Sequence, residues 1–238
     1  MATPFDAARS KLEAWQFGQL LVFFVLYLIF LPMLTHGIVV KFVASLLLLN
    51  ALLVAAAASP RAKIRRSGIW ALWLLSIAGM MVEQFDVHPS TAFVSKALGI
   101  GAHIVLILVC VASVLSVVFR AGRVTLDSIL ASAVAYQLIG FFFAQVYTMM
   151  MLLDPTSLHL PGNTASSGEV AQIEMIYFSF VTLATLGYGD IVPVTSLARS
   201  VAIIEAMVGQ FYVAVVVAVL VSAFVSQKVQ DRANASGG

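Results

Sequence analysis

Six long runs of apolar residues divide this chain, and they constrain its fold more than any other feature. A helix needs about 20 apolar residues to cross the roughly 30 Å hydrocarbon core of a bilayer. Of the 238 residues, 61% are hydrophobic and 10% are charged, whereas about a quarter of the residues in soluble domains are charged. We therefore predict an all-α integral membrane protein with six transmembrane helices. The six runs are Phe17–Leu34, Gly37–Ala58, Ile69–Phe85, Ala97–Phe119, Ile129–Leu153 and Leu197–Val225.

The distribution of Lys and Arg between the runs predicts the side on which each loop lies, because cytoplasmic loops carry an excess of basic residues. With the N-terminus inside, ten of the 13 Lys and Arg residues lie on the cytosolic side. Both termini are then cytosolic. The apolar composition and the lack of eukaryotic sorting signals indicate the inner membrane of a bacterium. The basic run Arg61–Arg66 has two interpretations, a topology anchor or a contact with lipid headgroups.

The residues between the fifth and sixth runs do not read as a simple loop. Asp154–Glu169 is polar and rich in turn-forming residues, but Ala171–Ala184 is apolar again. At 1.5 Å per residue a helix over that second part is only about 21 Å long, too short to cross the bilayer. Backbone at membrane depth must be buried in protein or line a watery cavity. We therefore predict a short helix that enters the membrane and a segment that returns.

The predicted return path carries the sequence T-L-A-T-L-G-Y-G-D at residues 182–190. If this segment lines a narrow pore with its carbonyls toward the axis, successive residues must alternate between ordinary and left-handed dihedrals. Glycine adopts left-handed dihedrals without steric cost, and Gly187 and Gly189 are two residues apart. The side chains of Leu186 and Tyr188 are then expected to pack back against the short helix. Thr185 can add a hydroxyl oxygen at the inner end.

This motif, after a short aromatic-rich helix, resembles the potassium channel pore signature, whose usual form is T-V-G-Y-G. The resemblance covers about a fifth of the chain, from Tyr177 to Val225. It implies a homotetramer in which four copies of the segment surround one pore, with permeant K⁺ as the bound ion and no other cofactor. In that family the filter carbonyls replace the hydration shell of the cation. The implied K⁺ ligands are the carbonyls of Thr185, Leu186, Gly187 and Tyr188.

The resemblance also implies roles for the residues around these ligands. Gly189 would close the strand, and Asp190 would lie behind the outer mouth with a hydrogen bond to the short helix. Thr182, Tyr177 and Phe178 would support the filter from that helix. The sequence departs from the usual pattern at several of these positions. Leu186 replaces Val or Ile, Tyr177 and Phe178 replace two tryptophans, and Val181 replaces a Glu of some members.

The first four runs carry no comparable signature. A voltage sensor would place Arg or Lys at every third residue of the fourth run, because gating charges must move through the field. Between Ala97 and Phe119 there is no Lys or Arg, so we expect weak or absent voltage dependence. His103 is the ionisable residue of that run. It is either a neutral histidine bonded to a neighbouring helix or a functional group.

Two residues of the sixth run are further candidates. Glu205 lies in its outer half, where a carboxylate needs a partner. It either braces the short helix from behind or responds to pH, and we favour the brace. Gly209 comes 19 residues after Asp190, where the family often has a hinge glycine; close helix packing through a small residue is the alternative. Gln210 and Tyr212 complete a G-Q-x-Y pattern to which the sequence attaches no mechanism.

These observations predict four parts of the chain: a cytosolic N-terminus over 1–16, a peripheral four-helix membrane domain over 17–128 without gating arginines, a pore domain over 129–226, and a cytosolic tail over 227–238. The ten residues after Lys228 are expected to fray, and no regulatory domain is expected after the sixth span. Cys110, the one cysteine, lies in an apolar run and is expected to be structural.

The leading functional hypothesis is a passive, potassium-selective channel. A poorly selective cation channel is the second, and a non-conducting sensor or accessory subunit is the third. An enzyme is not expected, because no metal cluster, nucleophile–base pair or phosphate loop is found in the sequence. A net charge of +2 gives no reason to expect nucleic acid as a partner, and no small-molecule substrate is indicated. The expected surroundings are the lipid bilayer and other copies of the chain.

Overall fold

The computed structural model describes residues 16–30, 74, 78, 89–120, 126–161 and 168–236 of the chain. The second and third predicted spans, Gly37–Ala58 and Ile69–Phe85, lie outside the described residues apart from Leu74 and Ala78. The basic run Arg61–Arg66 lies outside them as well. Within the described residues, three helices are long and apolar enough to cross a membrane. These apolar stretches are Phe93–Ser116, Ser128–Leu153 and Ser196–Ser226.

The helices α5 (Pro89–Arg120) and α6 (Leu126–Leu153) correspond to the fourth and fifth predicted spans and pack against each other. Helix α5 begins earlier than predicted, at Pro89, whose fixed φ and missing N–H suit the first position of a helix. Helix α6 ends where expected, in a turn in which the N–H and hydroxyl of Thr156 both donate to Asp154 Oδ1. Both helices are apolar over most of their length, in agreement with the predicted spans.

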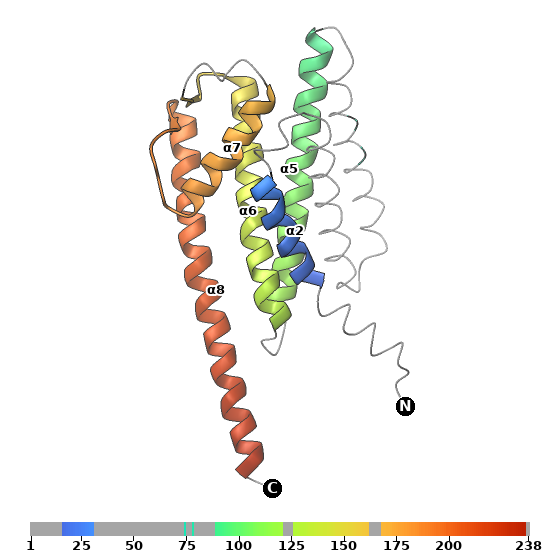
Figure 1. The fold of residues 1–238 in the computed structure, drawn as a ribbon, viewed down its shortest axis with the longest axis vertical. Helices are drawn as coiled ribbons and strands as arrows, with labels where there is room; N and C mark the ends of the chain where they lie inside the picture. The colour runs from blue at the N-terminus through green and yellow to red at the C-terminus, as the bar shows by residue number, and fades with distance from the viewer. Residues whose placement is uncertain are drawn as a thin grey trace.

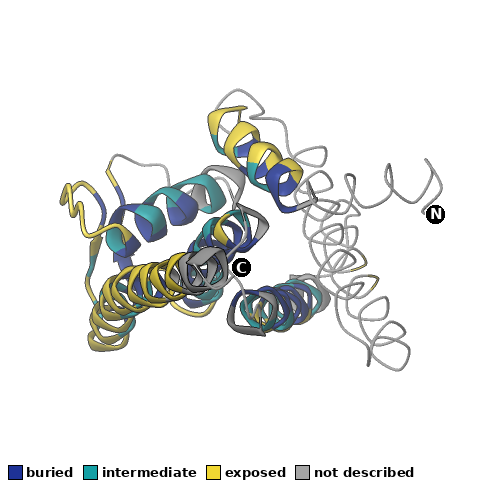
Figure 2. Cartoon of the chain, turned by 90° about the horizontal axis from the view of Figure 1, so that it is seen from below, coloured by how far each residue is buried: buried dark blue, intermediate teal, exposed yellow. Residues whose placement is uncertain are grey.

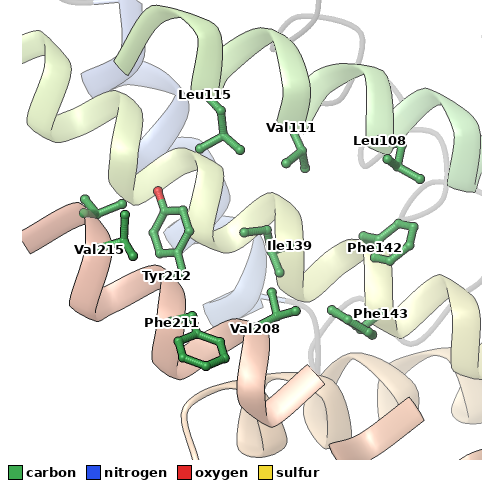
Figure 3. Close-up of a pocket in the computed structure, with 11 residues that line it drawn as sticks. Leu108, Val111, Leu115, Ile139, Phe142, Phe143, Val208, Phe211, Tyr212 and Val215 are labelled. Atoms are coloured by element: carbon green, nitrogen blue, oxygen red, sulfur yellow. The ribbon is translucent and has the colours of Figure 1, made fainter. Parts of the chain in front are cut away.

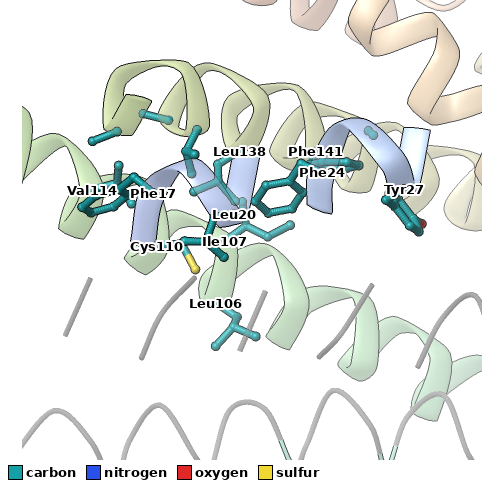
Figure 4. Close-up of a cluster of buried hydrophobic side chains, with 14 of the residues drawn as sticks. Phe17, Leu20, Phe24, Tyr27, Leu106, Ile107, Cys110, Val114, Leu138 and Phe141 are labelled. Atoms are coloured by element: carbon teal, nitrogen blue, oxygen red, sulfur yellow. The ribbon is translucent and has the colours of Figure 1, made fainter. Parts of the chain in front are cut away.

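Helix α2 (Gln16–Phe30) corresponds to the first predicted span, whose last residues lie outside the description. Over its 15 described residues it is shorter than a membrane crossing requires. Its buried residues recur at helical spacing and face α5 and α6 (Figure 4). In that cluster the ring of Phe141 lies 5.5 Å from Phe24 and 5.8 Å from Tyr27. Cys110 is buried in the same cluster, as expected of a structural cysteine.

Helix α7 (Gly168–Leu183) is the short helix predicted at Ala171–Ala184, and it lies between α6 and α8 (Ser196–Ser236). Figure 1 shows that α7 ends part-way along α8, after which residues 184–195 run back to the start of α8. We call residues 184–195 the return segment. Its outer part pairs with the loop after α6, because β1 (Leu158–His159) and β2 (Val192–Pro193) form an antiparallel pair with Leu158 opposite Pro193.

Helix α8 begins at a capping threonine and is longer than the sixth predicted span. The hydroxyl of Thr195 accepts from the N–H of Ala198, which satisfies one of the free donors of the first turn. The helix continues to Ser236, so the prediction of a frayed tail after Lys228 is wrong for residues 229–236. Those residues include Ala, Gln and Arg, which favour a helix. Figure 2 shows α8 exposed along most of its length within the single chain.

Candidate functional site

The return segment has an alternating backbone at its inner end. Gly187 and Gly189 have φ angles of +58° and +80°, which confirms the predicted left-handed dihedrals at both glycines. Thr185 also has a positive φ, +57°. Every second residue from 185 to 189 is therefore left-handed. A left-handed threonine is costly because its branched side chain crowds the backbone, and the sequence pattern did not predict it.

Backbone hydrogen bonds attach this inner end to the last turn of α7. The N–H groups of Leu186 and Gly187 both donate to Val181 O, at 2.9 and 3.4 Å. The N–H of Thr185 donates to Thr182 O at 2.9 Å. These bonds use carbonyls that would otherwise have no partner at the C-terminal end of a helix. Three successive amides of the return segment are thus directed toward α7. Thr182, predicted as a support residue, acts here through its backbone carbonyl.

The outer end of the return segment is held by Asp190 and Tyr177. Tyr177 Oη donates to Asp190 Oδ2 at 2.6 Å, and the N–H of Ile191 donates to the other carboxylate oxygen at 3.0 Å. The expected hydrogen bond from the short helix to Asp190 is therefore present. The hydrogen bond from Tyr177 lowers the pKa of the Asp190 carboxyl below its ordinary value. The ring of Tyr177 also stacks on Tyr188, with centroids 6.5 Å apart and an angle of 14° between the planes.

The other predicted side chains of this region have different surroundings. Tyr188 stacks on the Tyr177 ring of α7 but is 67% exposed within the single chain, so the expected packing against the short helix is only partly present. Leu186 does not, because 57% of its surface is exposed within the single chain. Phe178 is buried and faces α6, where its ring meets Tyr147 edge to face at 4.9 Å. Phe178 therefore supports α7 from behind and makes no contact of this kind with Tyr188.

Glu205 joins three helices. Its side chain has no exposed surface, and it is carried by α8. Tyr147 Oη of α6 donates to Glu205 Oε2 at 2.7 Å, and Ser179 Oγ of α7 lies 2.5 Å from Oε1. The same Ser179 oxygen lies 2.7 Å from Gly140 O on α6. This geometry agrees with the predicted brace behind the short helix. The role of Glu205 in function stays a prediction.

Gly209 is the point where α8 touches the end of α7. A Cβ atom built on Gly209 would lie 2.2 Å from Leu183 O, closer than real Cβ contacts allow. The absence of a side chain therefore permits this approach. Tyr136 Oη donates to the same Leu183 O at 3.2 Å. The structure supports the close-packing interpretation of Gly209, and the hinge stays a prediction.

Several site residues were missed by the sequence reasoning. Tyr147 and Ser179 were missed because their partner Glu205 is 58 and 26 residues away along the chain. Gly140, where an added Cβ would lie 2.9 Å from the ring of Phe180, was missed as well. The signal that could have indicated Tyr147 and Ser179 is the need of a buried carboxylate for hydroxyl partners on facing helices.

His103 is 3% exposed, and its Nε2 has no hydrogen-bond partner among the described residues. The expected bond to a neighbouring helix is thus not found in that part of the chain. Within the same described residues, no group of three or more His, Cys, Asp or Glu residues lies close enough together to hold a metal ion.

A cavity of about 480 Å³ lies between α5, α6 and α8 (Figure 3). Apolar side chains such as Leu108, Ile139 and Phe211 line it. The polar atom of its lining side chains, Tyr212 Oη, already donates to Ser132 O at 2.6 Å. A hydrophilic ligand needs several placed polar groups, and this lining does not offer them.

Long apolar helices around an extended segment, with α8 left uncovered by the rest of the chain, define a multi-pass membrane protein. A family model described as "Ion channel" matches residues 124–226, which include α6, α7, the return segment and most of α8. The chain therefore belongs to this ion channel family and is a passive ion channel.

Two relatives each match about 40% of the chain. Protein LctB of Bacillus caldotenax is 34% identical over 97 residues, which are 40% of this chain and 71% of the relative. Protein LctB of Geobacillus stearothermophilus is 33% identical over 99 residues, with the same two shares. No solved structure matches the chain. Membership in a channel family agrees with the expectation that the protein is not an enzyme.

Proposed function

We propose that the chain forms a homotetrameric, potassium-selective channel whose filter is the inner part of the return segment. The observation that carries the proposal is the alternation of left-handed residues at Thr185, Gly187 and Gly189. Such alternation lets consecutive carbonyls point to one side of a strand. The carbonyls of Thr185, Leu186, Gly187 and Tyr188 would then replace the hydration shell of K⁺.

The attachment of the return segment to α7 supports this arrangement. Because the amides of Leu186 and Gly187 donate to Val181 O, the N–H side of the strand is occupied by α7. The C-terminal end of α7 carries a partial negative charge, which favours a cation near Leu183. In a membrane, α7 and the return segment would form a re-entrant loop between two spanning helices.

The exposure of α8 supports assembly. The helix is apolar around its whole circumference between Val213 and Val219, yet only 12% of its apolar stretch is buried within the chain. Leu186 and Tyr188 of the return segment are exposed as well. Four copies around one axis would cover these surfaces and close the ring of carbonyls. Both termini would lie in the cytosol of a bacterial cell, following the distribution of Lys and Arg.

Voltage is proposed to have little effect on opening. In the described part of the peripheral region, no Lys or Arg lies between Ala97 and Phe119 of α5; Lys96 lies near the start of its apolar stretch, and Arg120 is the last residue of the helix. Moving gating charges through the field is what makes opening steeply voltage-dependent.

A poorly selective cation channel is the second candidate. Tyr188 makes no side-chain hydrogen bond to the described residues of its own chain, and Leu186 is less stiff than a β-branched residue. A filter with fewer attachments deforms more easily around ions of different size. Reversal potentials under opposed potassium and sodium gradients separate the two candidates.

The test is cation flux from liposomes that contain the purified protein. We expect potassium flux to exceed sodium flux, and we expect Gly187→Ala to abolish it. Apart from the two chain neighbours, no atom of the described residues lies within 4 Å of a Cβ added at Gly187, so this substitution acts mainly through the left-handed φ.

Gly101→Ala is the matched control, because it also meets no atom within 4 Å but lies in helix α5, where alanine is favourable. It should leave the flux unchanged. Equal potassium and sodium fluxes would favour the poorly selective channel. A folded tetramer with no flux would favour a sensor or accessory subunit.

A further inference from the structure

Gln210 makes a polar contact at the inner end of the return segment. Its Nε2 donates to Thr185 Oγ1 at 3.2 Å, so a residue of α8 reaches the first residue of the proposed filter. Both side chains are exposed within the single chain. The proposed function does not use Gln210, and the sequence attached no mechanism to its G-Q-x-Y pattern.

The neighbours of Gln210 fix the position of its backbone. On one side, Gly209 packs directly on Leu183 O. On the other side, Tyr212 Oη donates to Ser132 O of α6 at 2.6 Å. The rings of Tyr136 and Tyr212 also lie 5.5 Å apart, which holds α6 and α8 together at this level. Gln210 is therefore placed between two anchored residues, and its amide reaches Thr185 from a supported position.

The chemistry of the contact limits what it can do. A threonine hydroxyl has one hydrogen and two acceptor lone pairs. When Gln210 donates into one lone pair, it fixes the rotation of the hydroxyl and leaves the second lone pair for another partner. An amide supplies this donor without a formal charge. A lysine or arginine at the same place would repel an approaching cation.

The strained backbone of Thr185 makes such a support necessary. A left-handed residue other than glycine persists only where its surroundings determine its conformation. Here the backbone is held by the bond from its N–H to Thr182 O, and the side chain is held by Gln210.

We propose that Gln210 is a positioning residue for ion selectivity: it orients the Thr185 hydroxyl so that its free lone pair faces the innermost cation. This inference rests on the proposed function. The remaining members of the G-Q-x-Y pattern then have defined tasks, since Gly209 admits the end of α7 and Tyr212 anchors α8 to α6.

The experiment is a double-mutant cycle on the liposome assay with Gln210→Met, Thr185→Val and the double variant. Methionine has the length of glutamine but no donor. We expect Gln210→Met to lower the potassium-to-sodium flux ratio by about three- to tenfold, the size of one hydrogen bond. The double variant should match Thr185→Val alone, because the contact is already absent there. Gln210→Met should still form a folded tetramer, because the N–H of Thr185 keeps its bond to Thr182 O.

Gln172→Met is the matched control, because Gln172 lies at the other end of α7; its flux ratio should equal that of the unmodified protein. If Gln210→Met does not fold, Gln210→Asn replaces it, since its amide is one methylene too short to reach Thr185. An unchanged ratio in a folded variant, or additive effects of the two substitutions, would overturn the inference. An unmodified protein without selectivity would instead overturn the proposed function, and this inference with it.

Discussion

The two helices α6 and α8 are both long and apolar, but they have different surroundings. Within the single chain, 61% of the apolar stretch of α6 is buried, against 12% for α8. Helix α6 contacts α2, α5, α7 and α8, so the chain itself supplies its neighbours. Helix α8 contacts the rest of the chain mainly near its outer half, through residues such as Glu205 and Gly209.

The difference shows that similar composition serves two purposes in this protein. The residues of α6 form the core around which the other described helices pack. Those of α8 leave an apolar surface for lipid or for other copies of the chain. A helix that is hydrophobic all round must be covered by something, and for α8 that cover lies outside the single chain.

The largest expected effect follows from removing the same side chain on each helix. Phe141 of α6 is buried against Phe24, Tyr27 and Phe180. Phe141→Ala should lower the free energy of unfolding by about 3–4 kcal/mol, because truncating a buried Phe leaves a cavity. Phe211 of α8 is 62% exposed, so Phe211→Ala should leave the fold of the subunit intact and weaken only the assembly. Thermal unfolding in detergent, followed with and without dissociation of the oligomer, measures both. Equal losses of subunit stability would contradict the comparison.

The second largest effect is expected at Glu205, the buried residue through which α8 contacts α6 and α7. Glu205→Ala removes the acceptor of Tyr147, whose hydroxyl would be left buried without a partner, and one partner of Ser179, which keeps Gly140 O as an acceptor. We expect a loss of about 2–3 kcal/mol in the free energy of unfolding. Glu205→Gln keeps the shape, an acceptor and a donor, so its loss should be smaller. Thermal unfolding of both variants tests this. If Glu205→Ala is as stable as the original protein, the packing of the three helices does not depend on the carboxylate.

Two glycine substitutions sharpen the comparison further. In Gly209→Ala the new methyl meets a backbone carbonyl, Leu183 O, which cannot move without shifting α7. We therefore expect the free energy of unfolding to fall by about 2 kcal/mol and the flux to be reduced. In Gly140→Ala of α6 the methyl meets the far edge of the Phe180 ring, and a ring edge can shift more easily than a backbone carbonyl. The free energy of unfolding should therefore fall by less than about 1 kcal/mol. Unfolding and flux measurements on the two variants should therefore differ. The reverse order would mean that α8 is attached less firmly at Gly209 than the structure indicates.

The smallest effect is a pH dependence at the outer mouth. Because the folded-state pKa of Asp190 is lowered, the contribution of its carboxylate is present above about pH 4 and is lost as the pH falls through the lowered pKa. Tyr177→Phe removes the hydrogen bond that lowers this pKa, so the loss of flux on acidification should begin at a higher pH. Flux measured from pH 7 to pH 3 tests the shift.

Thr156→Ala serves as its control. Hydrogen bonds from Thr156 lower the pKa of another exposed carboxyl, Asp154, which lies in the loop after α6 and not in the return segment. This substitution should leave the acid limit of the flux where it is. If the flux of Tyr177→Phe has an unchanged acid limit, protonation of Asp190 does not set the acid limit of the flux.

The comparison also shows what the sequence could predict. The apolar runs identified α5, α6 and α8 because membrane-spanning helices require length and composition that single segments display. The spacing of Gly187 and Gly189 predicted their positive φ angles, since glycine is the residue that adopts them easily. Thr185 shares that conformation, but nothing in a threonine indicates it. Its φ follows from the neighbouring glycines and from the bonds to α7 and α8.

Contacts between residues far apart in the chain could not be predicted from the sequence. Glu205 was recognised as a carboxylate that needs partners, but Tyr147 and Ser179 could be named only once α6, α7 and α8 were placed together. Gln210 reaches Thr185 because α7 ends beside Gly209. The sequence of α8 does not indicate where α7 ends, so this contact could not be predicted. The end of α8 itself was underestimated because the polar residues after 226 still favour a helix.

The left-handed conformation of Thr185 has a consequence for how this chain can evolve. Glycine at that position would relax the backbone and make the chain easier to fold, and it would also remove the hydroxyl that meets Gln210. Selection for ease of folding alone would therefore favour glycine over threonine at this position. That a threonine occupies a conformation suited to glycine indicates that the oxygen is kept for what the assembled protein does, at the expense of the stability of the chain.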